Sequence, residues 1–453
     1  MSKAKTVDLT SGPILKTLAE LALPIMISSM LGTAYSIMDM AWIGLLGAKA
    51  VAGVGVGGMY VWLSQGLASL SRMGGQVNTA QACGRKDYDQ ARSYAASSLQ
   101  LTALSGILFA AVCVIFIQPL LGFFNLTDAE TYTAARSYTL ITCGLILFSY
   151  LNLTLTGLST AQGDSRTPFV ANFAGMAANI VLDPLFIFAF HLGVRGAALA
   201  TILSQAVSCI WVLSFLCGKK TILHIRKKNL ILKPEIILPC VALGLATFIM
   251  QASESIISVC FNSSLLKYGG DIAVGAMTIL TSVMQFAMLP LQGLGQGAQP
   301  VLSYNYGAKN RDRVKKAFRL LLTASLCYST ILWAFIMLFP QVFAEMFTSD
   351  SALLGFTKSA LRIYCACLLL FGIQIACQMA FTSFGKAKAS IAVAVTRKFI
   401  LLLPLIYLLP HILTGNKTNA VYMAEPIADF LAVSFTTVLF TFQFRKVLKE
   451  LEG

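Results

Sequence analysis

Two acidic residues lie where an acid can do chemistry inside a membrane. Asp39 and Asp183 each stand alone in a long apolar run, SSMLGTAYSIMDMAWIG and ANFAGMAANIVLDPLFIFAF. An acid at the centre of such a segment costs roughly 2.5–3.5 kcal/mol and therefore indicates a functional site. Apolar surroundings favour the neutral form of a carboxyl group, so both residues are candidates to bind and release a proton near physiological pH. Alternatively, two neutral acids hold helices together by hydrogen bonds.

Membrane-spanning helices are the elements that must position these acids. Hydrophobic residues make up 57% of the 453 residues and charged residues 12%, and the apolar residues occur in long blocks. About 20 apolar residues suffice to cross the hydrocarbon core, and no segment shows the charged face of a soluble helix. We predict an all-α integral membrane protein of about twelve spans, at residues 15–45, 51–80, 91–117, 131–161, 168–190, 196–217, 236–266, 273–303, 316–340, 352–383, 389–410 and 419–443.

The net charge of +15 is distributed asymmetrically between the loops. Loops on one side of the twelve-span arrangement contain little beyond Lys49, Arg195, Lys267 and Lys417. The positive-inside rule then places both termini in the cytoplasm, and it explains the basic clusters without a nucleic-acid partner. The clusters on the other side are Lys3, Lys5, Lys16, Arg85, Lys86, Arg92, Arg166, Lys219, Lys220, Arg226, Lys227, Lys228, Lys233, Lys309, Arg311, Arg313, Lys315, Lys316, Lys386, Lys388, Arg445, Lys446 and Lys449.

Other residue types that carry chemistry are not arranged for it. Most of the eleven cysteines lie in apolar runs, and the three histidines are not paired at metal-ligand spacing. No Walker, HExxH or GxSxG sequence is present. We therefore expect neither an enzyme nor a cofactor or bound metal.

The chain repeats itself. The loops NTAQACGRKDYDQAR and LSYNYGAKNRDRVKK align Gly84 with Gly307, 223 residues apart, and LDPLFIF aligned with LLPLIYL pairs Pro184 with Pro404, 220 apart. Two homologous bundles of six helices follow, and because six is even they form a parallel repeat about an axis along the membrane normal. We predict an N-terminal lobe at residues 1–218, a cytoplasmic linker at 219–235 and a C-terminal lobe at 236–453.

Several segments together resemble a known transporter family. GPILKTLAELALPIM, SIMDMAWIGLLGAKAVAGVGV, QACGRKDYDQAR, AQGDSRTP, ANIVLDPLFIF and YGAKNRDR look like the multidrug and toxic compound extrusion (MATE) transporters, over about residues 10–445. The resemblance implies alternating-access antiport that exports amphipathic, often cationic compounds against protons or sodium. We expect such a protein to lie in a bacterial inner membrane and to function as a monomer.

The resemblance also implies roles for particular residues of the first half. Family members carry acids on the first helix and in the LDP segment of the fifth, which match Asp39 and Asp183. Polar positions of the family map onto Asn179, Thr201 and Asn152, although Thr201 and Asn152 are equally explained as polar packing residues. Pro24 and Pro184 are predicted to let their helices bend. Both acids would lie ~10–12 Å below the outer ends of their helices, at matching depth.

The second half carries different charges. Some family members pair a glutamate like Glu254 with an aspartate on the tenth helix to bind sodium. Here that helix offers Gln374 and Gln378 instead, which argues against a sodium site in the second lobe. We predict that Glu254 attracts cationic substrates, with a structural role as the alternative.

Further charged residues lie within the predicted spans. One of Arg397, Lys398, Arg362 and Arg72 is expected to neutralise Glu254 or the acids Glu425 and Asp429, which share a helix face. The roles of Glu425 and Asp429 stay open.

A flippase for lipid-linked sugars, from the wider superfamily of this fold, is the alternative function. It would show a strongly cationic central cavity and often additional spans. The few cations within these spans favour an exporter.

Overall fold

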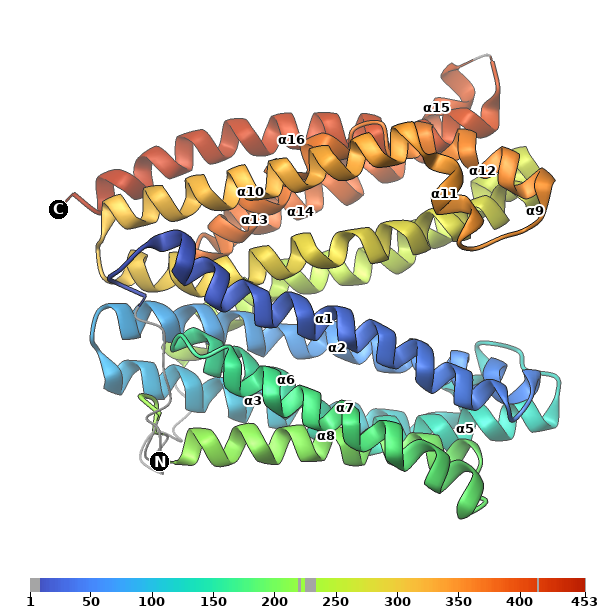
Figure 1. The fold of residues 1–453 in the computed structure, drawn as a ribbon, viewed down its shortest axis with the longest axis horizontal. Coiled ribbons are helices and arrows are strands. Elements are labelled where there is room, and N and C mark those ends of the chain that lie inside the picture. The colour runs from blue at the N-terminus through green and yellow to red at the C-terminus, as the bar shows by residue number, and fades with distance from the viewer. Residues whose placement is uncertain (1–8, 219–220, 225–233, 414, 453) are drawn as a thin grey trace. The chain divides into compact units, whose positions relative to one another are not determined.

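The computed structural model describes residues 9–218, 221–224, 234–413 and 415–452. Within these residues every regular element is a helix, as the composition predicted (Figure 1). Most of the predicted linker 219–235 lies outside the described residues, together with Lys3, Lys5, Lys219, Lys220, Arg226, Lys227, Lys228 and Lys233. The elements are α1 (Ile14–Gly44), α2 (Ala48–Gly84), α3 (Tyr88–Ile115), α4 (Ile117–Gly122), α5 (Ala129–Gly144), α6 (Leu147–Ala161), α7 (Arg166–Pro184), the π-helix η1 (Leu185–Ala189), α8 (Val194–Cys217), α9 (Pro234–Gly307), α10 (Arg311–Leu338), α11 (Pro340–Glu345), α12 (Ser351–Tyr364), the 3₁₀-helix η3 (Leu368–Leu370), α13 (Phe371–Ser383), α14 (Ala387–Val395), the π-helix η4 (Thr396–Leu402), α15 (Leu403–Ile412) and α16 (Lys417–Glu450).

These helices account for twelve spans. Eight stretches of the described residues are long and apolar enough to cross a membrane, and two bent pairs, α5 with α6 and α12 with α13, make ten. The 74 residues of α9 would measure ~110 Å as one helix, so α9 is two spans joined at Gly270, where φ is +67°. The Gly-rich α2, of 37 residues, is the twelfth.

Polar loop residues begin the helices at the spacing of the repeat. Asp87 and Asn310, which are 223 residues apart, accept hydrogen bonds from the first turns of α3 and α10. Asp128 and Asp350, 222 apart, do the same for α5 and α12. Such caps stabilise a helix by ~1 kcal/mol. The backbone N–H of Thr131, the ammonium group of Lys49 and the Thr131 hydroxyl hold the pKa of Asp128 at about 2, so this cap stays ionised at physiological pH.

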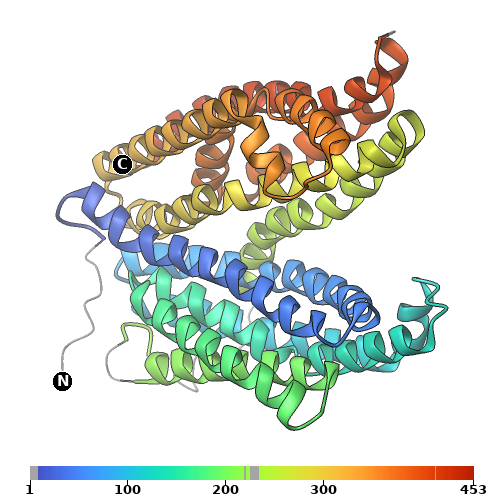
Figure 2. The same cartoon turned by 45° about the vertical axis from the view of Figure 1, so that its right-hand side comes forward.

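The chain packs as two units, each with a core of its own. The first consists of Met1–Phe248 with Ser303–Ala308, and the second of Ile249–Leu302 with Lys309–Gly453. In the first unit α1, α2, α3, α6, α7 and α8 run alongside one another (Figures 1 and 2). The core of the second unit is built around Phe261, Leu280, Leu361 and Tyr422, from α9, α12 and α16. The division by packing thus places the first part of α9 with the first unit.

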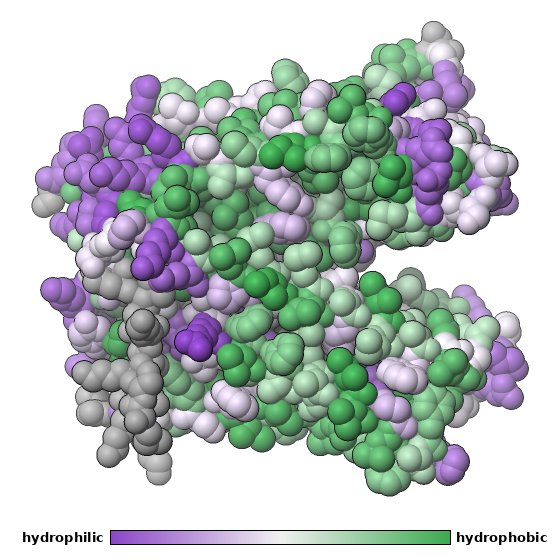
Figure 3. Space-filling view, in the orientation of Figure 1, coloured by the Kyte–Doolittle hydropathy of each residue, from purple (hydrophilic) through white to green (hydrophobic). Residues whose placement is uncertain are grey.

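In each unit, the polarity of the exposed side chains changes along the length of the helices. Apolar side chains cover the middle of the helices and hydrophilic ones gather at their ends (Figure 3). Many large apolar side chains on these helices are exposed, including Ile37, Val181 and Phe442. Exposed apolar residues on helices whose backbone hydrogen bonds are internally satisfied are what a lipid-facing surface requires.

Candidate functional site

The two acids predicted from the sequence come together inside the first unit. Asp39 of α1 is 9% exposed and Asp183 of α7 is 1% exposed, and α1 packs against α7. Their carboxyl groups lie within hydrogen-bonding range of each other. A hydrogen bond between two carboxyl groups requires a proton, because two carboxylates offer only acceptors. The arrangement of the two acids therefore suits the binding of one positive charge, such as a proton, between them.

Asn179 connects Asp183 to the other helices of the site. With its amide nitrogen turned toward the acid, Asn179 donates to Oδ2 of Asp183 over 2.6 Å. Its oxygen then accepts from the Tyr35 hydroxyl at 3.1 Å and from the backbone N–H of Thr201 at 3.3 Å. One amide thus joins α1, α7 and α8 around the acids.

Two tyrosines of the site were missed by the sequence analysis. Tyr35 lies beside Asn179 and the side chain of Thr201, and Tyr138 of α5 is buried close to Asp39 and Asp183. Tyr35 is four residues before Asp39, so it shares a helix face with the acid, and this spacing could have identified it. No local signal marks Tyr138, which reaches the site because Gly57 lets α5 approach α2; a Cβ at Gly57 would meet the Tyr138 ring at 2.7 Å.

Thr201 and Asn152, both mapped from the resemblance, lie in different surroundings. Thr201 belongs to the site through its backbone N–H and its contact with Tyr35, while its hydroxyl donates to the Ala197 carbonyl within α8. Asn152 of α6 instead donates to Asn172 over 3.3 Å and to Gln205 over 3.0 Å. These bonds tie α6 to α7 and α8 in a second polar group.

The two predicted helix-bending prolines differ in their local structure. Pro24 lies within α1, which continues without a break from Ile14 to Gly44. Pro184 is the last residue of α7, and the π-helix η1 follows directly. Proline cannot donate a backbone hydrogen bond, and the irregular backbone begins at Leu185, two residues after Asp183.

One oxygen of the acid pair has no protein donor. Among the described residues, none donates to Oδ1 of Asp39, although this atom is buried. A buried acceptor without a partner costs ~1–3 kcal/mol. A proton or a small cation would satisfy it, so the geometry suits reversible binding of a coupling ion.

Five of the charged residues predicted within the spans of the second unit form two ion-paired groups. Lys398 lies 2.7 Å from Glu254, whose side chain is 53% exposed, and Arg397 lies 2.9 Å from Glu425 and 2.7 Å from Asp429. The cation beside Glu254 is thus Lys398.

The remaining predicted residues take other partners. Gln378 donates to Ser390, which ties α13 to α14, and Gln374 is buried on the same helix. Arg362 donates to the Met337 carbonyl over 3.3 Å. Arg72 forms no ion pair with any described residue.

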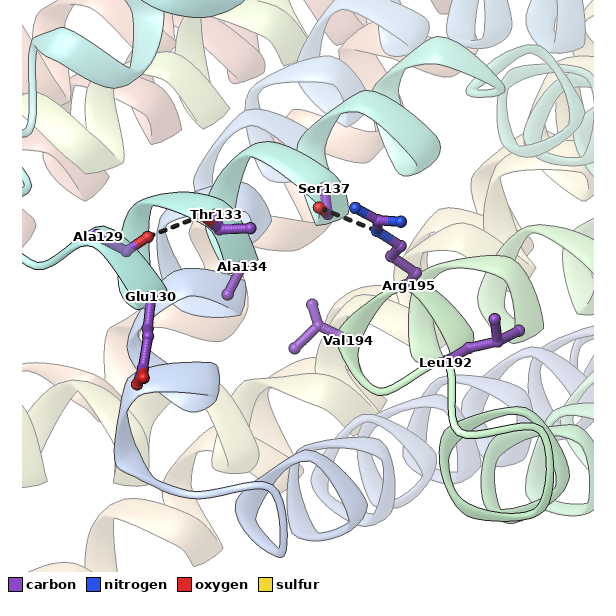
Figure 4. A pocket seen from close by; sticks show the side chains of 8 residues that line it. All are labelled: Ala129, Glu130, Thr133, Ala134, Ser137, Leu192, Val194 and Arg195. Carbon is purple, nitrogen blue, oxygen red and sulfur yellow. Dashed lines mark hydrogen bonds between the residues drawn. The ribbon is translucent and has the colours of Figure 1, made fainter.

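A surface cavity of about 410 Å³ lies elsewhere in the first unit, where α5 and α8 begin. The guanidinium group of Arg195 lies beside Ser137, with Nε 3.4 Å from the hydroxyl oxygen (Figure 4). Glu130 at its edge is ion-paired to Lys49. None of the residues that line this cavity belongs to the acid pair; they are Ala129, Glu130, Thr133, Ala134, Ser137, Leu192, Val194 and Arg195.

The fold and the buried acid pair define a membrane transporter, and comparison with known proteins gives its family. The MatE family model matches residues 24–185 and 246–408, two segments that start 222 residues apart, as the internal repeat predicted. The chain therefore belongs to the MatE family of multidrug and toxic compound extrusion transporters, which are not enzymes.

Individual relatives agree with this assignment. The chain is 22% identical over 423 residues to the multidrug export protein MepA of Staphylococcus haemolyticus (strain JCSC1435), covering 93% of this chain and 92% of that protein. It also resembles the crystal structure of MATE in the bent conformation, with a TM-score of 0.93 and 24% identity over the full length of both chains. The crystal structure of MATE in the straight conformation gives a TM-score of 0.91 and 25% identity, and the match covers 99% of this chain and 100% of that chain. These matches favour an exporter over the flippase alternative, and the chain is a multi-pass plasma-membrane protein.

Proposed function

We propose that this protein exports amphipathic organic cations in exchange for protons. The observation that carries the proposal is the contact between the carboxyl groups of Asp39 and Asp183, with Asn179 as donor to the second acid. A site that holds one exchangeable positive charge within a membrane-spanning bundle is what proton coupling requires. Similarity to multidrug export proteins supports the substrate class.

Coupling follows from a difference in proton affinity between two conformations. A proton can shift the equilibrium between inward-open and outward-open states only by its differential affinity for them. In the outward-open state a proton joins the acid pair, changes the contacts of α1 and α7 near Pro24 and Pro184, and favours release of the substrate. Reopening to the cytoplasm releases the proton.

Glu254 is the proposed contact for cationic substrates in the second unit. Half of its side chain is exposed although its neighbour Lys398 is buried. A carboxylate that keeps one side open attracts an organic cation. The protein works as a monomer with both termini in the cytoplasm, so that the loops rich in Lys and Arg face inward.

Transport in proteoliposomes tests the proposal. Uptake of a fluorescent organic cation is measured under an imposed proton gradient, an imposed sodium gradient or neither, for wild type, Asp39→Asn and Asp183→Asn. We expect uptake driven by the proton gradient in the wild type and its loss in both variants. Equal transport by both variants would refute coupling through the acid pair. Uptake driven only by the sodium gradient would show that the coupling ion is sodium. Uptake that needs neither gradient would indicate a facilitator.

A further inference from the structure

Three charged side chains are buried together inside the second unit. Arg397 of η4 lies between Glu425 and Asp429 of α16, and each side chain is 10% exposed. Nη2 of Arg397 is 2.9 Å from Oε1 of Glu425 and 2.7 Å from Oδ1 of Asp429, and Nε donates to that same aspartate oxygen over 2.8 Å. The guanidinium carbon lies 4.8 Å from the centroid of the Phe371 ring. We call Arg397, Glu425 and Asp429 the buried triad.

The buried triad contains more acid than base. The neighbouring pair of Lys398 and Glu254, 2.7 Å apart, balances itself and supplies no spare positive charge. With all five groups ionised, three negative charges face two positive ones. An unpartnered charge in a membrane interior costs several kcal/mol. The group therefore needs one more positive charge.

Among the described residues, no other titratable group near the triad supplies that charge. On α12, which packs against α16, Lys358 donates to Gln341 and Arg362 to the Met337 carbonyl. Tyr364 ends α12, and Cys365 and Cys367 lie in the turn that follows, near Glu425 or Asp429. Tyrosine and cysteine are neutral or negative in water at any ordinary pH. The helices α13, α14 and α15 also pack against α16. Their titratable residues are Cys377, Lys388, Tyr407 and His411, of which Lys388 and His411 lie at opposite ends of one span.

The backbone is irregular at the triad. Thr396–Leu402 is a π-helix, and within it the consecutive residues Arg397 and Lys398 are both buried and bind different acids. Pro426 lies between the two acids in α16 and removes one backbone hydrogen bond there. π-helical turns occur frequently at functional sites, and the first unit has one that begins two residues after Asp183, at Leu185.

The first half of the chain has nothing equivalent. With the starts of α8 and α16 aligned, at Val194 and Lys417, Glu425 and Asp429 lie opposite Ile202 and Ala206. The two repeats thus carry their buried acids on different helices. A second site in the second unit would be independent in position from the acid pair of the first.

We propose that the buried triad binds one proton and is a second proton-binding site of this transporter. One carboxylate of Glu425 or Asp429 takes up the proton to become a carboxylic acid, which leaves the other carboxylate paired with Arg397. The binding of the proton stands on the charge balance alone, whereas its use in transport rests on the proposed function.

The geometry favours a proton over a sodium ion. A sodium ion needs several oxygen ligands around it, whereas the nearest oxygen of each acid is already bound to the guanidinium group of Arg397. Among the described residues there is no group of three or more His, Cys, Asp or Glu side chains that could hold a metal ion. A proton needs only one free carboxylate oxygen.

Infrared difference spectroscopy of the purified protein tests the site without measuring transport. The spectra are recorded during a pH titration of an Asp39→Asn/Asp183→Asn variant, so that the first acid pair is silent. We expect a carbonyl band from a protonated carboxyl group, and we expect this band to disappear at high pH. In the same background, Glu425→Gln should reduce the intensity of the band by that of one carboxyl group. Asp429→Asn provides the same test if Glu425→Gln does not fold.

Controls separate a proton site from a structural ion pair. Glu345→Gln changes an exposed acid on α11 and should leave the titrating band unchanged. A titrating band that neither Glu425→Gln nor Asp429→Asn alters, in variants with wild-type thermal stability, would overturn the proposal. A band that sodium removes at constant pH would also overturn it, because the ligand would then be sodium. Failure of proton-driven transport in the wild type would refute the proposed function and leave this readout unaffected.

Discussion

At the scale of residues, a chain of polar contacts between α1 and α7 leads to the acid pair. Tyr35 donates to Asn179, Asn179 donates to Asp183, and Asp183 meets Asp39. Asn179 favours the ionised form of Asp183 by donating to it, whereas the contact with Asp39 favours a proton between the two acids. A site that must take up and release a proton needs both influences.

Replacing Asn179 tests this chain. Asn179→Leu removes the donor to Asp183, and loss of a hydrogen bond to a charged group costs ~1.5–3 kcal/mol. We expect proton-driven transport to fall about tenfold or more. The measurement is the initial rate of substrate uptake under a proton gradient.

Thr33→Val is the matched control for Asn179→Leu. The Thr33 hydroxyl donates to the Ser29 carbonyl within α1, 3.2 Å away, so its loss should leave the rate within about twofold of wild type. A wild-type rate in Asn179→Leu would show that this donor does not matter for coupling.

Sequence reasoning found some of these residues and not others for a physical reason. Asp39 and Asp183 were predictable because an acid in an apolar run is costly wherever it lies. Asn179 is four residues before Asp183 and Tyr35 is four residues before Asp39, so the spacing places each polar residue on the same helix face as its acid. Tyr138 and the pairing of Arg397 with Glu425 and Asp429 depend on contacts between distant segments, which no local pattern encodes.

At the scale of elements, small residues set how closely the helices around the acid pair approach one another. Gly175 of α7 lies against α8, where an added Cβ would meet the Ser208 hydroxyl and lie 2.8 Å from the Ser204 carbonyl oxygen. The hydroxyl can rotate away, but the backbone carbonyl cannot. This contact holds Asn179 and Thr201 on facing turns of the two helices.

Gly175→Ala should therefore destabilise the first unit. Overpacking costs ~1–3 kcal/mol, which exceeds the ~0.5–1 kcal/mol that alanine gains over glycine in a helix. We expect a lower thermal unfolding temperature of the purified protein and slower transport. Gly32→Ala in α1 is the control, because nothing lies within 4 Å of its added Cβ. Equal unfolding temperatures for the two variants would contradict the role given to Gly175.

The elements themselves were largely predictable. Apolar length gave the twelve spans, and the capping residues Asp87 and Asn310 recur at the spacing of the repeat. The two π-helices were not predictable, because periodicity assumes regular helices and η1 and η4 depart from it beside buried charges.

At the scale of the whole molecule, export in exchange for protons requires a fixed direction in the membrane. The basic residues Arg85, Lys86 and Arg166 lie where α2 ends and where α3 and α7 begin, and Lys49 lies near the opposite end of α2. If both termini are cytoplasmic, Lys86 faces the cytoplasm and Lys49 the outside.

Labelling of single cysteines tests this orientation. In a background without the eleven native cysteines, we expect a membrane-impermeant maleimide to label Lys49→Cys in intact cells and Lys86→Cys only after the membrane is permeabilised. The reverse pattern would invert the topology and place the basic loops outside.

Proton movement driven by the substrate tests the central claim most directly. Proteoliposomes are loaded with an organic cation and a pH-sensitive dye, the membrane potential is clamped, and the vesicles are diluted into buffer without substrate. Exchange through Asp39 and Asp183 predicts acidification of the lumen as the cation leaves, and no acidification with Asp39→Asn or Asp183→Asn. Cation efflux from wild-type vesicles without any change in luminal pH would contradict proton antiport.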